Sequence, residues 1–240
     1  MNYRPSLNMP PVVKNLILVN VLFFVVTKIV GQTGTDLYKV LGLYFPASDN
    51  FRMHQLFTHM FMHGSIGHIF FNMFALYMFG RVLESVWGPK RFLTFFLVTG
   101  LGAAALHIFV MFIEYKSAIS QISPDQLAYF KELAAQGKYI PNIASEKITS
   151  LLNTPTVGAS GAVFGILLGF GMLFPNTELM LLFPPIPIKA KYFVIGYGVL
   201  ELVLGLSQPG SNVAHFAHLG GMLFGYFMIR YWNKNSNSFY

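Results

Sequence analysis

Two polar side chains in an otherwise apolar chain are of the types that acyl-transfer chemistry needs. Ser160 lies in Gly158-Ala159-Ser160-Gly161, at the beginning of one apolar stretch, and His218 lies in "AHLGG", near the beginning of another. A serine hydroxyl is a weak nucleophile unless an adjacent base accepts its proton, and histidine is the usual base. We therefore expect Ser160 to act as nucleophile and His218 as general base and acid.

A third polar cluster lies in "HMFMHGSIGHIFFN" and offers donors for an oxyanion. His68 and Asn72 are four residues apart and share one face if this stretch is helical. The backbone N–H of Ser160 is a further donor, because amides in the first turn of a helix lack intrahelical acceptors. We expect these three groups to form an oxyanion hole. His59 and His63 are also four residues apart and share a face if that stretch is helical.

Small residues recur at every fourth position beside both Ser160 and His218. The two rows are Gly161, Gly165 and Gly169 in one segment, and Ala217, Gly221 and Gly225 in the other. Such rows let two membrane helices approach closely, and by themselves they usually indicate packing alone. The functional interpretation depends on the serine, the histidine and the oxyanion donors meeting at one depth.

Composition determines which elements must carry these residues. Of 240 residues, 54% are hydrophobic and 10% are charged, and the mean hydropathy is +0.54. A soluble domain carries about 25% charged residues, so the chain is predicted to be an all-α, polytopic membrane protein. The absence of cysteine excludes disulfides, thiolate catalysis and cysteine-based metal sites. The net charge of +7 comes from basic residues beside apolar segments, which indicates membrane topology and not a nucleic-acid partner.

Six apolar segments are predicted to span a bilayer, of which the fifth is short. They run over about 12–30, 55–84, 92–115, 157–174, 192–206 and 213–232. We expect one domain, 1–240, in which these segments form a compact six-helix bundle. The polar stretch 116–156 is predicted to be an extramembrane loop with a short amphipathic helix. A stiff turn, "FPPIPIKAK", joins the fourth and fifth segments.

Basic residues predict the orientation. With both termini in the cytoplasm, nine of the 16 Lys and Arg lie inside and seven outside, four of these in the long loop. The inside set is Arg4, Lys14, Arg81, Lys90, Arg91, Lys189, Lys191, Arg230 and Lys234. The first residues lack a signal-peptide cleavage site, so no processing is expected. We expect a multi-pass protein of the plasma (inner) membrane whose even-numbered segments begin at the outer face.

Together, the three motifs resemble those of the rhomboid family of intramembrane serine proteases, over roughly residues 12–232. The resemblance implies a Ser–His dyad without an acid, at Ser160 and His218, and an oxyanion hole that includes His68 and Asn72. It also implies supporting roles for His59, His63, Gly158, Gly161, Gly221 and Gly225. Transmembrane proteins with small or helix-breaking residues near the outer boundary would be the substrates, reaching the site laterally past the fifth segment. No cofactor is expected.

Two features depart from the family pattern or lie beyond it. Many relatives carry Trp-Arg in the first loop where this chain has His54-Gln55, which makes the packing of that loop an open question. Glu201 is the carboxylate well inside a predicted span. We expect it to be a structural partner or a cavity-facing residue rather than a third member of the dyad. The role of His215, three residues before His218, is expected to be non-catalytic.

Three other functions compete with a protease. A metal-dependent membrane protein is conceivable because His59, His63 and His68 could converge, but no His-Glu-x-x-His motif is present. A transporter or channel would show broken helices and polar groups at the midplane, whereas the polar groups here are predicted toward one face. An inactive rhomboid-like binding protein is disfavoured because both Ser160 and His218 are present. Oligomeric state, substrate identity and the role of loop 116–156 stay open.

Overall fold

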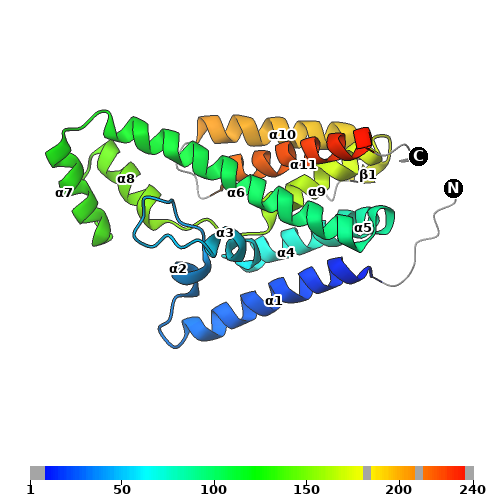
Figure 1. Ribbon diagram of the computed structural model, residues 1–240, viewed down its shortest axis with the longest axis horizontal. Coiled ribbons are helices and arrows are strands. Elements are labelled where there is room, and N and C mark those ends of the chain that lie inside the picture. Colours follow the sequence, from blue (N-terminus) through cyan, green and yellow to red (C-terminus); the bar gives the residue numbers. More distant parts are fainter. Residues whose placement is uncertain (1–8, 181–184, 209–212, 236–240) are drawn as a thin grey trace.

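The computed structural model of the chain describes residues 9–180, 185–208 and 213–235. Arg4, which entered the charge count, and residues 183 and 184 of the Pro-rich turn lie outside these ranges. The described chain is mostly helical, and each of the six expected segments carries a helix (Figure 1). These helices are α1 (Pro11–Gly31), α4 (Ile66–Ala75) with α5 (Arg81–Trp87), α6 (Pro89–Ile119), α9 (Ser160–Leu173), α10 (Ala190–Ser207) and α11 (His215–Asn235).

Four of these elements are long and apolar enough to cross a membrane. They are α1, the continuous helix Ile66–Trp87, α6 and α10. The helix α9 is apolar but only 14 residues long. The helix α11 has 21 residues, but it has His215 and His218 in its first turn and carries Arg230. α1 begins and α11 ends at the same end of the bundle, while α9 and α11 run side by side at its centre (Figure 1).

The second segment is not one helix over 55–84. Its first part forms the short helix α3 (Gln55–Thr58) and the 3-10 turn η1 (His59–Phe61), and the spanning helix begins only at Ile66. The backbone turns to an extended conformation at Met62, and Ser65 caps α4 by accepting a hydrogen bond from the His68 amide at 3.1 Å. A π-helical turn, η2 (Leu76–Gly80), joins α4 to α5. His59 and His63 therefore do not share a face of the spanning helix.

Gln55 organises the first loop, which includes the short helix α2 (Leu37–Leu41). The buried side-chain oxygen of Gln55 accepts hydrogen bonds from the backbone amides of Tyr44 and Arg52 at 3.3 and 3.1 Å. Its amide nitrogen donates to the carbonyls of Asn50 and Val40 at 2.9 and 3.4 Å. These bonds use the full capacity of a side-chain amide. A buried Gln thus holds the first loop by bonds to the backbone.

The stretch after the third span is more helical than predicted. α6 continues to Ile119, and two helices follow instead of one, α7 (Pro124–Ala135) and α8 (Ile143–Asn153). Ser123 and Gln126 form a capping box at the start of α7. The two helices pack together beyond one end of the bundle around Phe130 and Ile148 (Figure 1). A two-stranded antiparallel pair, β1 (Glu178–Met180) and β2 (Pro187–Lys189), lies between α9 and α10.

The centre of the bundle is built on close approach between α6, α9 and α11. A β-carbon at Gly221 would overlap the carbonyl oxygen of Gly161, so these two helices touch through their backbones. On another side, a β-carbon at Gly161 would overlap the methyl of Ala103 in α6. The small-residue rows therefore do bring helices together, as expected. The first row faces α6 as well as α11.

A buried carboxylate fixes the beginning of α1 at the opposite end of the bundle from α7 and α8. Glu84 of α5 is 2% exposed and accepts from the amides of Val12 and Val13 at 2.9 and 2.8 Å. The first amides of a helix lack acceptors within the helix and carry partial positive charge. Glu84 satisfies two of them and ties α1, which is otherwise loosely packed, to the bundle.

Candidate active site

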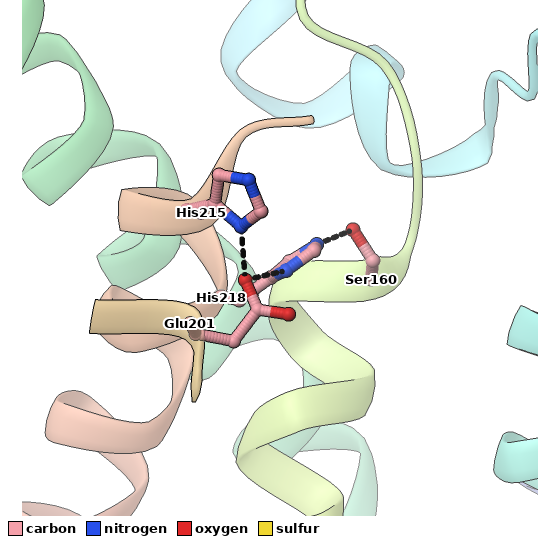
Figure 2. A network of polar contacts seen from close by, with 4 residues as sticks. All are labelled: Ser160, Glu201, His215 and His218. Atoms are coloured by element: carbon pink, nitrogen blue, oxygen red, sulfur yellow. Dashed lines mark hydrogen bonds and ion pairs between the residues drawn. The ribbon is translucent and has the colours of Figure 1, made fainter. Parts of the chain in front are cut away.

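Ser160 and His218 meet at the start of α9 and in the first turn of α11. The Oγ of Ser160 lies 2.8 Å from Nε2 of His218, although 58 residues separate them in the chain. Ser160 is the first residue of its helix, and His218 is 9% exposed (Figure 2). The backbone contact between Gly161 and Gly221 lies directly beside this pair and accounts for the short distance between the two side chains.

The imidazole of His218 is held on its face and on its second nitrogen. Its ring stacks on Phe164, with centroids 4.2 Å apart and an interplanar angle of 4°, and Phe164 stacks in turn on Tyr197 of α10. Its Nδ1 lies 2.9 Å from Oε2 of Glu201, and the same oxygen lies 2.6 Å from Nδ1 of His215. Figure 2 shows the carboxylate between the two imidazoles, with Ser160 on the far side of His218. The sequence did not predict the stacking of Phe164 on His218.

His68 and Asn72 lie on α4 and face the same cavity as Ser160. A β-carbon at Gly158 would lie 2.7 Å from Nε2 of His68 and 3.6 Å from Oγ of Ser160, so the imidazole stands close to the serine. Gly158 has a φ of 129°, a conformation that residues with a side chain rarely adopt. Asn72 donates from Nδ2 to the carbonyl of His68 at 2.9 Å. This bond orients the Asn72 amide along the helix.

His59 and His63 contact this region in different ways. The carbonyl of His59 accepts from the Gly158 amide at 2.9 Å, which ties η1 to the loop before Ser160. The His59 ring, through Nδ1, contacts the carbonyl of Gln55 at 2.8 Å. His63, in the segment between α1 and α4, packs its ring edge-on against His68 at 5.0 Å. Burial lowers the pKa of His63 to about 4, which keeps it neutral.

A cavity of about 1340 Å³ borders Ser160 and His218. One wall is polar and includes His107 of α6, whose Nε2 lies 2.8 Å from Oγ1 of Thr156. The sequence did not single out His107, although a histidine in the middle of a long apolar helix is the kind of residue that marks a polar cavity. Another part of the lining is apolar. They include Phe71, Phe74 and Met78 from α4 and η2, and Phe193 and Tyr197 from α10.

A metal ion could use part of the same polar cluster. Ligand atoms of Glu201, His215 and His218 lie within 4.8 Å of one another and are buried. Two imidazoles and a carboxylate suit zinc. This set differs from the His59, His63 and His68 set that the sequence suggested. An ion there would have to replace the hydrogen bonds between Glu201 and the two imidazoles.

Comparison with known proteins identifies the family. The model of the rhomboid domain matches residues 50–234. The chain belongs to the rhomboid family. The match includes both helices that carry Ser160 and His218, together with α4, α6 and α10. This rhomboid is accordingly a multi-pass membrane protein.

Curated relatives cover most of this chain. It is 31% identical over 215 residues to RHOMBOID-like protein 12, mitochondrial, of Arabidopsis thaliana. The matched region covers 88% of this chain and 55% of that protein. It is 24% identical over 215 residues to Rhomboid protease GluP of Bacillus subtilis, covering 86% of this chain and 31% of that protein. Rhomboid protein 1, mitochondrial, of Saccharomyces cerevisiae is 24% identical and covers 69% of this chain and 38% of that protein. The chain thus spans about half or less of the length of these relatives.

Proposed function

We propose that this rhomboid is a serine endopeptidase that hydrolyses peptide bonds in or near the transmembrane helices of membrane-protein substrates. The observation that carries the proposal is the 2.8 Å contact between Ser160 Oγ and His218 Nε2 at the wall of a large cavity. The name of the Bacillus subtilis relative, a rhomboid protease, supports the same reaction class. All six apolar helices, α9 and α11 included, are proposed to lie within the membrane.

The chemistry begins with transfer of the Ser160 hydroxyl proton to Nε2 of His218 as Oγ attacks a peptide carbonyl. The oxyanion is stabilised by the Ser160 amide and by the side chains of His68 and Asn72, for which the Asn72 amide turns away from the His68 carbonyl. His218 then returns the proton to the leaving amine. Water from the cavity hydrolyses the acyl-enzyme by the same steps in the second half of the reaction.

Substrate helices are proposed to reach the serine between α4 and α10. Phe71 and Phe74 on one helix and Phe193 on the other give the cavity apolar walls there, which suit a helix arriving from lipid. A helical amide is already paired within its own backbone. The substrate must therefore unwind locally, which favours small or helix-breaking residues near the cleaved bond.

The orientation is proposed from the charges of the loops and from the end of the bundle at which α1 begins and α11 ends (Figure 1). Both termini are placed on the positive, cytoplasmic side. Two of the relatives described above are named mitochondrial. A plasma-membrane location therefore stays a prediction.

The test is cleavage of a model transmembrane substrate by purified protein in detergent and in liposomes. Ser160→Ala and His218→Ala should each abolish product formation, while Leu202→Ala, on the exposed face of α10, should retain it. A fluorophosphonate should label the wild type and not Ser160→Ala. Cleavage by Ser160→Ala at the wild-type rate would overturn the proposal. Loss of activity in a chelator, with recovery on adding zinc, would favour the metal-dependent alternative.

A further inference from the structure

Glu201 stands where a carboxylate can control the proton of His218. It is 5% exposed on α10, and its Oε2 lies 2.9 Å from Nδ1 of His218, on the side of the ring opposite Ser160. A carboxylate buried in a membrane helix is costly and needs a partner. Among the described residues, its hydrogen-bond partners are His215 and His218.

Resting on the proposed function, we infer that Glu201 is a positioning residue that makes the Ser160–His218 pair a Ser–His–Glu triad. An ionised carboxylate only accepts hydrogen bonds, so the proton of neutral His218 resides on Nδ1. Nε2 is then left as the acceptor that the Ser160 hydroxyl needs. This differs from the acid-free dyad that the family resemblance implied.

The same carboxylate stabilises the charge that forms during the reaction. When Nε2 takes the Ser160 proton, the imidazole becomes a cation that holds both protons, and Glu201 neither gains nor loses one. The positive charge then lies against a carboxylate inside a poorly solvated site, where Coulomb attraction is stronger than in water. The effect is largest in the transition state, so it acts on kcat.

His215 holds the carboxylate in place. Its Nδ1 donates to the same Oε2 at 2.6 Å from the first residue of α11. Two donors on one oxygen restrict the rotation of the Glu201 side chain. The stacked rings of Phe164 and Tyr197 hold the plane of His218 from the other direction. The carboxylate of Glu201 thus contacts the same imidazole, that of His218, that contacts Ser160.

The decisive measurement is steady-state cleavage of one transmembrane substrate by Glu201→Gln and Glu201→Asp, with rates expressed per fluorophosphonate-reactive serine. Glu201→Gln should lower kcat about 100-fold or more and change KM less than about twofold, a range typical of acid–base catalysis. Glu201→Asp should recover part of that loss. Leu202→Ala is the matched control, since it lies next to Glu201 and is 45% exposed.

A second readout needs no substitution at Glu201. Proton NMR of wild-type protein labelled with ¹⁵N-histidine should show a low-field Nδ1–H resonance that disappears in His218→Ala. Its absence in the wild type, or wild-type kcat in folded Glu201→Gln, would overturn the triad. If Ser160→Ala also cleaved substrate, the protease itself would be rejected. If Ser160→Ala were inactive and Glu201→Gln fully active, the triad would be rejected and the protease would stand. Zinc-dependent activity would reassign Glu201, His215 and His218 to a metal site.

Discussion

The α-carbon of Gly221 faces the carbonyl oxygen of Gly161 so closely that no β-carbon fits between them. These two glycines join α11 to α9 one residue after Ser160 and three residues after His218. The hydrogen bond between Ser160 and His218 depends on this approach, because a side chain at either position would separate the two helices. Packing and chemistry are therefore linked at one point of the bundle.

Gly221→Ala is expected to lower both activity and stability. The added methyl must displace the backbone of α9, and overpacking of this kind costs about 1–3 kcal/mol. Separation of the helices should lengthen the Ser160–His218 contact and reduce cleavage at least tenfold. Thermal unfolding in detergent and substrate cleavage measure the two effects. Gly196→Ala is the control, because nothing lies within 4 Å of a β-carbon there; equal behaviour of the two variants would contradict the packing argument.

Gly158→Ala should damage the site more than the fold. At a φ of 129° a residue with a side chain is strained by about 1–3 kcal/mol, and the methyl would press on Nε2 of His68 at 2.7 Å. We expect reduced kcat and slower labelling by a fluorophosphonate. Gly34→Ala is a matched control with a φ of 88° and open space around it. If Gly34→Ala and Gly158→Ala lost activity equally, the position of His68 would not be the cause.

Glu84→Gln should destabilise the protein without changing its chemistry. The substitution removes the negative charge of the carboxylate, which accepts hydrogen bonds from two backbone amides at the beginning of α1. Hydrogen bonds to charged groups contribute about 1.5–3 kcal/mol, so a clear fall in the midpoint of thermal unfolding is expected. The rate per fluorophosphonate-reactive serine should stay at the wild-type value. Glu132→Gln, at an exposed position on α7, serves as the comparison and should leave the midpoint unchanged.

Cross-linking α4 to α10 should exclude membrane substrates while leaving the serine reactive. The chain has no cysteine, so Phe74→Cys and Phe193→Cys introduce unique thiols at the border of the cavity. A flexible bifunctional maleimide should abolish cleavage of a transmembrane substrate in the double variant and retain labelling by a small fluorophosphonate. The single variants treated with the same reagent are the controls. Undiminished cleavage by the cross-linked protein would argue against lateral access between these helices.

The expectations that rested on runs of apolar residues agree most directly with the structure. Six apolar segments each carry a helix because a chain in lipid must pair its backbone groups within each segment. The expected bounds of the second segment, 55–84, did not place a break before Ile66, although Gly64 and Gly67 lie on either side of it and can distort a helix. The run from Gln55 to Glu84 is apolar over most of its length, but Ser65 caps a new helix that begins at Ile66. The second helix after α6 was also missed, although Asn142 caps α8 and its buried residues Ala144, Ile148 and Leu151 recur at helical spacing.

Within the site, the sequence by itself determined the chemical types. It supplied a serine at a helix start, histidines in two other segments, and glycines spaced to let helices touch. Tertiary structure alone decided which nitrogen of His218 faces Ser160 and which faces Glu201, because that depends on the rotation of α10 against α11. The same holds for Gln55, whose four hydrogen bonds join backbone groups 3 to 15 residues away in the first loop. Periodicity records which face of a helix is apolar, but hydrogen-bond partners across 14 to 58 residues are set only when the helices pack.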